Sequence, residues 1–172
     1  MWGIVWRRIG GAALVASSLA FACPAAATAT TGTGTAAIVT PLTVVNAAPL
    51  SFGSVVPGAA SGTVTIDAFT EARTVAGGVS AAGGTVSAAK FSGLTTSLSH
   101  LKIDIPNGAI TLTRVGGGAT MTVDSFALNG NKNDWVASTT VFSFQVGAVL
   151  HVGANQLAGT YNGTFNVTVN YR

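Results

Sequence analysis

The stretch that decides the fold runs from Val146 to Arg172 and has the sequence VGAVLHVGANQLAGTYNGTFNVTVNYR. From residue 165 onward its apolar residues occupy alternate positions, Phe165, Val167, Val169 and Tyr171, with polar residues between them. Because successive side chains of a strand point to opposite faces, this spacing predicts a strand with one apolar face and one hydroxyl or amide face. It also raises the question of what covers that apolar face and what pairs with the edges of the strand.

The same period of two recurs further upstream. Six apolar or small residues share one face of the segment before the turn at residues 153–156: Phe142, Phe144, Val146, Ala148, Leu150 and Val152. Shorter alternating runs end at Ile66 and at Ile105. Apolar residues at helical spacing are missing after residue 27, so we predict an all-β antiparallel sandwich of about seven to nine strands.

Glycine and proline mark the expected turns. Pro57-Gly58 and Pro106-Asn107-Gly108 predict two of them, and the four glycines in residues 76–84 predict a connection rather than a strand. Gly147 and Gly153 fall inside or beside a long apolar run, where glycine indicates a bulge or a bend. Residues 129–134, NGNKND, form the most polar loop.

Residues 1–27 have the three parts of a secretory signal peptide. Arg7 and Arg8 precede an apolar run over residues 9–22, and Ala25-Ala26-Ala27 supplies the small residues of a cleavage site. The run is shorter than the roughly 20 residues that a membrane helix needs. We therefore expect secretion through the periplasm to the cell surface and a mature form that has no membrane segment.

The mature chain is expected to contain one domain, residues 46–172, preceded by an N-terminal extension, residues 28–45. The extension begins with the low-complexity run TATTGTGT and continues with β-branched residues. Pro41 cannot donate a hydrogen bond to a ladder, which favours an edge strand or a break between two short strands here. One face of the extension carries alternate residues: Ala36, Ile38, Thr40, Leu42 and Val44.

Charge and cysteine content narrow the possible functions. The single cysteine, Cys23, lies in the predicted signal peptide, so no disulfide is expected in the mature protein. After residue 27 the chain has six basic and five acidic residues, and Thr, Ser, Asn, Ala and Gly replace the usual surface charges. Since there is no basic patch, binding to nucleic acid is not expected. Such a surface is suited to packing against other protein.

Catalytic groups are few. His100 and His151 are far apart in the sequence, and neither has the spacing of a metal ligand with Asp, Glu or Cys. His151 is expected to be a solvated strand residue. The scattered residues Asp104, Asp124 and Asp134 are interpreted as surface carboxylates. We therefore expect no enzyme activity, no metal and no cofactor.

The C-terminal stretch resembles the last strand of pilins that are assembled by the chaperone–usher route. In those pilins a glycine fourteen residues from the end is followed by alternating apolar residues and a penultimate aromatic; Gly159 and Tyr171 hold these positions here. Leu50-Ser51-Phe52-Gly53 and the end of the chain are also similar to spore coat protein U-like subunits of archaic pili. The run from Pro49 to Tyr171 resembles most closely a domain family of unknown function in secreted Gram-negative proteins.

The resemblance implies an immunoglobulin-like sandwich that lacks its own last strand. In such pilins the gap beside the C-terminal strand is filled first by a periplasmic chaperone and then, at an outer-membrane usher, by the N-terminal extension of the next copy. The implied donor strand contains Ala36, Ile38, Thr40, Leu42 and Val44. The implied wall of the acceptor groove contains Gly159, Phe165, Val167, Val169 and Tyr171.

Two functions therefore remain open. The first is a structural subunit of an extracellular surface filament, built from copies of this chain by donor strands and supporting adhesion or biofilm formation. The second is a self-contained secreted β-sandwich that binds a glycan or a surface partner. Trp135 is the only tryptophan after residue 27 and is the candidate contact for a sugar in the second case.

Overall fold

The long strand β11, Val141–Val152, organises the core of the fold. Its six inward-facing residues, from Phe142 to Val152, are all buried, which confirms the predicted shared face. Opposite β9 the register shifts between Gly147 and Val149, and the extra residue of this bulge lies on β9 rather than at Gly147, where the sequence indicated a bulge or a bend. The computed structural model describes residues 36, 38, 41–96 and 98–172, and the predicted signal peptide and residues 28–35 lie outside this range.

The chain divides into two units, Met1–Ala36 and Ala37–Arg172, and every described residue except Ala36 belongs to the second. The described residues contain thirteen strands and no helix. The strands other than β11 are β1 Thr43–Ala48, β2 Ser51–Phe52, β3 Val55–Ile66, β4 Arg73–Ala81, β5 Val86–Ser87, β6 Ala89–Leu94, β7 Ser99–Asp104, β8 Ile110–Arg114, β9 Thr120–Leu128, β10 Trp135–Ala137, β12 Tyr161–Asn162 and β13 Thr168–Tyr171.

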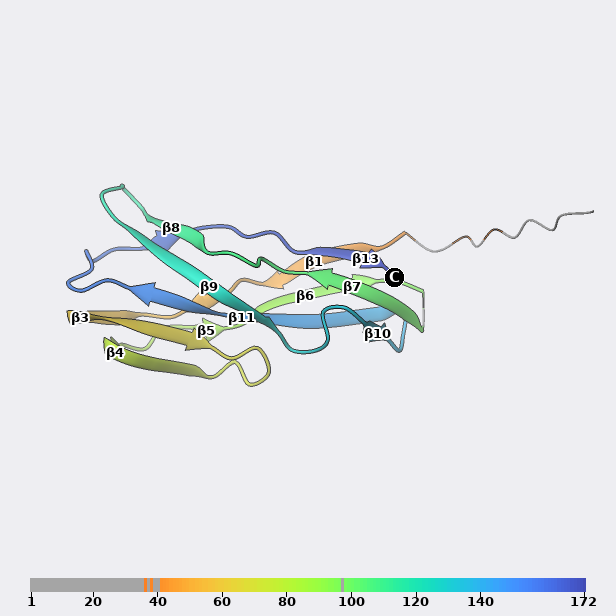
Figure 1. Cartoon of the computed structure of the whole chain (residues 1–172), viewed down its shortest axis with the longest axis horizontal. Coiled ribbons are helices and arrows are strands. Elements are labelled where there is room, and N and C mark those ends of the chain that lie inside the picture. Colours follow the sequence, from red (N-terminus) through yellow and green to blue (C-terminus); the bar gives the residue numbers. More distant parts are fainter. Residues whose placement is uncertain (1–35, 37, 39–40, 97) are drawn as a thin grey trace, which may run out of the picture. The chain divides into compact units, whose positions relative to one another are not determined.

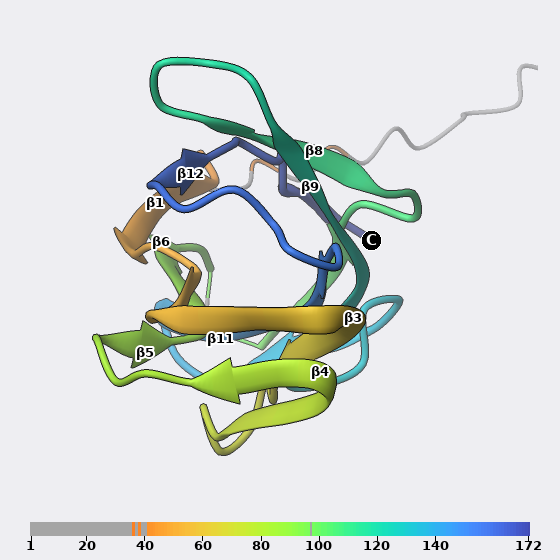
Figure 2. The same cartoon turned by 90° about the vertical axis from the view of Figure 1, so that its left-hand side faces the viewer.

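Antiparallel pairing arranges these strands into three sheets. The largest has eight strands in the order β1-β6-β11-β9-β8-β12, with β3 paired to β11 and β4 paired to β3. The others are the three-stranded sheet β10-β7-β13 and the pair β2-β5. The large sheet curls, so that β8 and β12 lie opposite β3 and β11 (Figure 2). The three-stranded sheet lies at the end of the fold that carries the C-terminus (Figure 1). The all-β antiparallel prediction is confirmed.

The buried residues form two neighbouring core clusters. The first joins β3, β9 and the second half of β11 through residues such as Val64, Val123 and Leu150. The second joins β6, β7 and the first half of β11 and is rich in aromatic rings. Phe144 is at its centre, with ring centroids 5.2 Å from Phe91 and 6.2 Å from Phe142.

Two turn predictions are wrong, and glycine is the reason. Strand β3 continues through Pro57-Gly58, and β4 occupies most of the segment predicted as a connection. Between Pro57 and Gly62 the register of β3 with β4 shifts, which leaves a bulge at this point. A Cβ atom on Gly78 would collide with the Ala60 backbone, so this glycine permits a close approach of two strands rather than a turn. The described strands are also more numerous than predicted, and β3 is longer.

Candidate functional site

The C-terminal segment runs antiparallel to β7 and β8 but pairs with them only at its two ends. Strand β12 pairs with β8 through Asn162 opposite Thr113, and β13 pairs with β7 through Thr168 opposite Asp104. Between these pairs, five residues, 163–167, face eight residues, 105–112. The longer side contains Pro106, which lacks an N–H, so the ladder is interrupted. The strand expected from Gly159 onward is therefore divided into β12 and β13.

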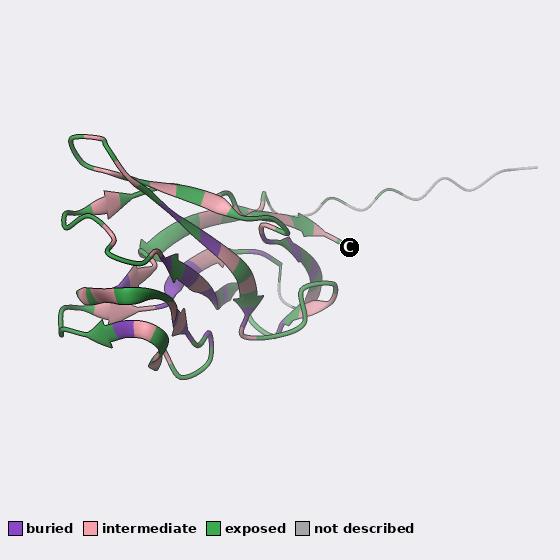
Figure 3. Ribbon diagram, turned by 60° about the vertical axis from the view of Figure 1, so that its left-hand side comes forward, coloured by how far each residue is buried: buried purple, intermediate pink, exposed green. Residues whose placement is uncertain are grey.

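The predicted alternation of inward apolar and outward polar side chains continues across this interruption. Phe165, Val167, Val169 and Tyr171 are half-buried, and the polar residues between them are exposed. All four pack against the second core cluster. The ring of Phe165 meets Phe126 at 5.1 Å and Phe91 at 6.3 Å. Strand β13 therefore faces the core, yet it carries only half-buried and exposed residues (Figure 3).

Tyr171 links the three-stranded sheet to the loop after β6 of the large sheet. The buried hydroxyl of Thr95, in the loop after β6, donates to the Tyr171 hydroxyl at 3.1 Å. This hydrogen bond holds the pKa of Tyr171 below its ordinary value, because it favours the phenolate, and Thr96 adds to the effect. The aromatic residue near the end thus satisfies a polar group that would otherwise be costly to bury.

Gly159 lies beneath the side chain of Arg114. The Arg114 Nε donates to the carbonyl of Ala158 at 2.7 Å, and a Cβ atom on Gly159 would come within 2.5 Å of the same nitrogen. The φ of Gly159 is 151°, which residues with a side chain rarely adopt. Glycine at this position lets Arg114 fasten the turn before β12 onto β8.

The end of β13 is held by charged groups from three elements. His100 Nδ1 on β7 donates to Asp134 Oδ1 at 2.6 Å, and the Arg172 guanidinium lies 3.3 Å from Asp134 Oδ2. The Arg172 backbone N–H donates to the His100 carbonyl at 2.9 Å. The hydrogen bond from His100 is the main reason that the pKa of Asp134 lies below its ordinary value, and Arg172 lowers it further.

Replacing Asp134 by asparagine is expected to destabilise the protein at neutral pH, because the carboxylate that joins β7 and β13 is lost. A lowered pKa means that this stabilisation is fully present above the unfolded value of about 3.9 and is lost as the pH falls through the folded value. The urea midpoints of variant and parent should therefore differ at pH 7 and converge as the pH falls through the lowered pKa of Asp134. Asp104→Asn, which removes an exposed partner of Lys102, is the control. A difference that persists unchanged in acid would contradict this assignment.

Strand β1 is a second end strand that borders the second core cluster, in addition to β13. It is the end strand of the large sheet and pairs only with β6 among the described strands. Leu42 and Val44 are half-buried against the second core cluster. Ala36 and Ile38 are exposed, and Ile38 is 99% exposed. Thr40 lies outside the described residues.

The candidate site is therefore the pair of end strands β1 and β13. Each has one ladder partner among the described strands, and each contributes half-buried side chains to the same core cluster. An end strand presents a row of unpaired N–H and C=O groups that another strand can join. The structure thus separates the predicted donor residues: Leu42 and Val44 pack against their own chain, whereas Ile38 is left exposed.

The histidines have partners that sequence spacing did not reveal. His151 Nε2 on β11 lies 2.9 Å from Asp124 Oδ1 on β9, and His100 pairs with Asp134 as above. The adjacent strands bring these residues together, so only the strand order could have predicted the pairs. The described residues contain no group of three His, Cys, Asp or Glu side chains that would hold a metal. His151, as expected, is exposed on its strand.

Trp135 and a surface hollow over β3, β9 and β11 bear on the glycan-binding alternative. Trp135 is half-buried, with its ring 6.1 Å from Phe144, so it belongs to the wall of the core. The hollow, of about 540 Å³, lies over β3, β9 and β11 and includes Thr63, Thr122 and His151. Its lining contains hydroxyls, an amide and the His151 imidazole but no Phe, Tyr or Trp ring that would stack on a sugar.

The described part of the chain is an antiparallel β-protein in which two of the end strands, β1 and β13, border the same core cluster. Residues 42–171 match the family model described as "Domain of unknown function (DUF4402)", and the chain belongs to this family. The matched region starts one residue before β1 and ends with β13. Searches of curated proteins and of solved structures gave no match. Within the described part of the chain, no helix has the length and apolar character needed to cross a membrane.

Proposed function

We propose that the protein is a pilin-like structural subunit of an extracellular filament, in which residues 28–40 of one copy complete the open edge of the next. The observation that carries this proposal is the pair of end strands β1 and β13, which leave apolar side chains of one core cluster half-buried. The C-terminal pattern that resembles chaperone–usher pilins supports it. A periplasmic chaperone would cover the same edge before assembly.

The proposed donor is shorter than the extension inferred from the sequence. Because Leu42 and Val44 already pack against their own core, they belong to the acceptor side. Ile38 is the largest exposed apolar residue that precedes β1 among the described residues. Fully burying such a side chain contributes about 1.5–3 kcal/mol. Covering what remains exposed of each half-buried acceptor residue contributes only about 0.5 kcal/mol. Ile38 and the acceptor residues taken together would therefore contribute comparable apolar burial, and backbone hydrogen bonds would add to both.

Strand addition of this kind propagates. The donor segment and the acceptor edge are different surfaces of the same chain, so each contact leaves one free donor and one free edge. Such a head-to-tail contact forms an open filament unless its rotation closes a ring. The low number of charged residues after residue 27 is compatible with close packing of identical copies.

Removing residues 28–40 is expected to abolish filaments while leaving a folded acceptor, because the donor is lost and β1 and β13 remain. The parent, the deletion variant and the point variant Ile38→Asp are compared in cells by imaging the surface and by sizing extracted protein. Filaments should be present only in the parent, and the deletion variant should bind a synthetic peptide of residues 28–40.

Ile38→Val is the matched control and should retain filaments, because valine preserves most of the apolar contact. A parent that is extracted as monodisperse monomers, with residues 28–40 protected from protease within the same molecule, would rule out the proposal. It would then favour a self-contained β-sandwich.

A further inference from the structure

Phe69 is an exposed aromatic side chain on an otherwise well-filled fold. It lies in the loop of residues 67–72 between β3 and β4 and is 69% exposed. Every other phenylalanine that the structure describes is buried or half-buried. Large aromatic residues dominate the binding energy of protein interfaces when they insert into a partner.

The loop that carries Phe69 is held rigidly. The Asp67 Oδ1 atom accepts hydrogen bonds from the backbone N–H of Phe69 at 2.9 Å, from that of Thr70 at 2.8 Å and from the Thr70 hydroxyl at 2.9 Å. The Asp67 and Ala72 ends of the loop are joined by a backbone hydrogen bond of 3.1 Å. Phe69 is therefore presented at little further cost in conformational entropy on binding.

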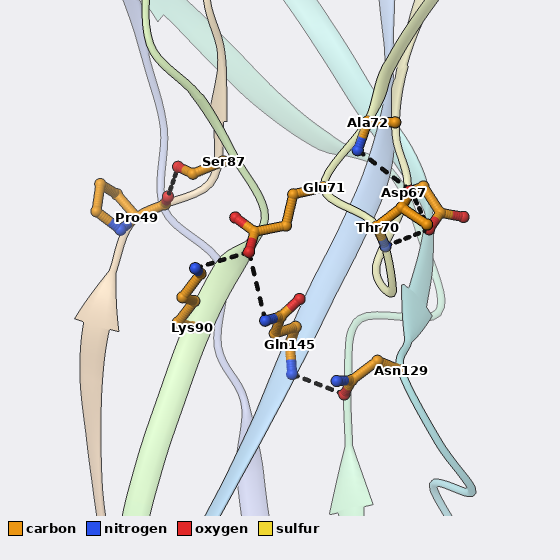
Figure 4. Close-up of polar contacts among 9 residues, drawn as sticks. All are labelled: Pro49, Asp67, Thr70, Glu71, Ala72, Ser87, Lys90, Asn129 and Gln145. Atoms are coloured by element: carbon orange, nitrogen blue, oxygen red, sulfur yellow. Dashed lines mark hydrogen bonds and ion pairs between the residues drawn. The ribbon is translucent and has the colours of Figure 1, made fainter.

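Contacts with strands β6 and β11 also hold this loop in place. Glu71, which has a φ of 59°, lies 2.7 Å from the Lys90 ammonium of β6 and accepts from Gln145 of β11 at 3.5 Å (Figure 4). The backbone N–H of Gln145 in turn donates to the Asn129 Oδ1 atom at 2.8 Å. Glu71 thus retains an unfavourable backbone conformation because two strands hold its carboxylate.

The fold also carries an apolar hollow that no described residue fills. It has a volume of about 230 Å³ and is lined by Thr43 and Val45 of β1, Ser92, Gly93 and Leu94 of β6, and Val141 of β11. Thr43, Leu94 and Val141 lie side by side across the sheet. Val45, Leu94 and Val141 are each more than half exposed.

Size and charge indicate what the hollow accepts. It is smaller than the roughly 300–1,000 Å³ of a site for a drug-sized ligand, and one aromatic side chain is of suitable size. None of its lining residues is charged. Lys90 of β6 and Glu71 of the loop form an ion pair and neutralise each other. Because the hollow itself is uncharged, the ring of a second copy can enter it without burying a charge.

We propose that Phe69 of one copy inserts into the hollow formed by Val45, Leu94 and Val141 of a second copy. The two surfaces belong to one chain, so this contact joins identical subunits. It uses neither residues 28–40 nor β13, and from β1 it uses the exposed side chains of Thr43 and Val45 on the outer face rather than the free edge of the strand. It can therefore form beside the donor-strand contact.

The test uses two variants that each lose one half of the contact, both made in the chain that carries Ile38→Asp. That background blocks donor-strand exchange if it occurs and is without effect if it does not, so this proposal and the filament proposal fail separately. Phe69→Ala removes the aromatic ring and leaves the hollow. Leu94→Asp places a charge in the hollow and leaves the ring.

Sedimentation equilibrium is expected to show that the Ile38→Asp chain self-associates and that either further substitution weakens the association about thirtyfold or more. Mixing the two variants should restore a one-to-one complex, because the ring of one chain meets the intact hollow of the other. Val115→Ala, at a residue that is 60% exposed elsewhere on the fold, should leave association unchanged. A monomeric parent, unaltered association of Phe69→Ala, or a mixture that stays monomeric would overturn the proposal.

Discussion

Replacing Phe144 by alanine is expected to lower the free energy of unfolding by about 3–5 kcal/mol. Phe144 is 1% exposed and meets three aromatic rings, at centroid distances of 5.2 Å for Phe91, 6.2 Å for Phe142 and 6.1 Å for Trp135. Its removal leaves a cavity that these rings cannot fill without leaving their own positions. A domain of this size is typically stable by about 5–15 kcal/mol, so the loss is a large fraction of the total.

No disulfide stabilises the second core cluster, so the loss of packing at Phe144 should appear directly in the measured free energy of unfolding. The chain has a single cysteine, so no disulfide can form within it. Urea unfolding of the parent and of Phe144→Ala measures the difference, with Phe69→Ala as the control that removes an exposed ring of the same type. The control should change stability by no more than about 0.5 kcal/mol. Equal losses in both variants would show that Phe144 is not central to the core.

The sequence predicted the fold class because the side-chain period of a strand is a local property. The alternation at Phe142 to Val152 and at Phe165 to Tyr171 identifies which side chains face inward, and the structure confirms both. Glycine was misinterpreted for a physical reason. A glycine in a turn and a glycine at a close approach of two strands look alike in the sequence, and only the pairing of β3 with β4 distinguishes them.

The candidate site was predictable only in part. The residues of β13 follow from periodicity, and the edge position of β1 follows from Pro41. The partners that complete the site do not follow, because Tyr171 reaches Thr95 and Arg172 reaches Asp134 through the fold rather than along the chain. For the same reason the sequence placed Leu42 and Val44 with Ile38 on a donor strand, whereas the structure packs the first two against their own core.

A cysteine at residue 38 is expected to form disulfides with cysteines on the inward face of the C-terminal segment and not with those on its outward face. Neighbouring strands lie about 4.7–5.5 Å apart, within the Cα separation that a disulfide spans. The chain with Cys23→Ser and Ile38→Cys is co-expressed with chains that carry Cys23→Ser and one cysteine at Phe165, Val167 or Val169. Cysteines at Asn166 and Thr168, which are exposed, provide the controls.

These covalent dimers should change from absent to abundant as the cysteine moves by a single residue. The reason is that a donor strand beside β13 presents Ile38 to only one of its two faces. Two chains with different tags distinguish this dimer from one formed by two copies of the same variant. Equal yields at inward and outward positions would mean that residue 38 has no fixed place beside β13.

The most direct test of the filament account places both cysteines in one chain, Ile38→Cys and Val167→Cys, with Cys23→Ser. After mild oxidation on the cell surface, donor-strand assembly predicts a ladder of covalent oligomers on a non-reducing gel, because residue 38 of each copy lies beside residue 167 of the next. Disulfide-closed monomers would show that the segment before β1 folds onto its own chain, and they would contradict donor-strand assembly.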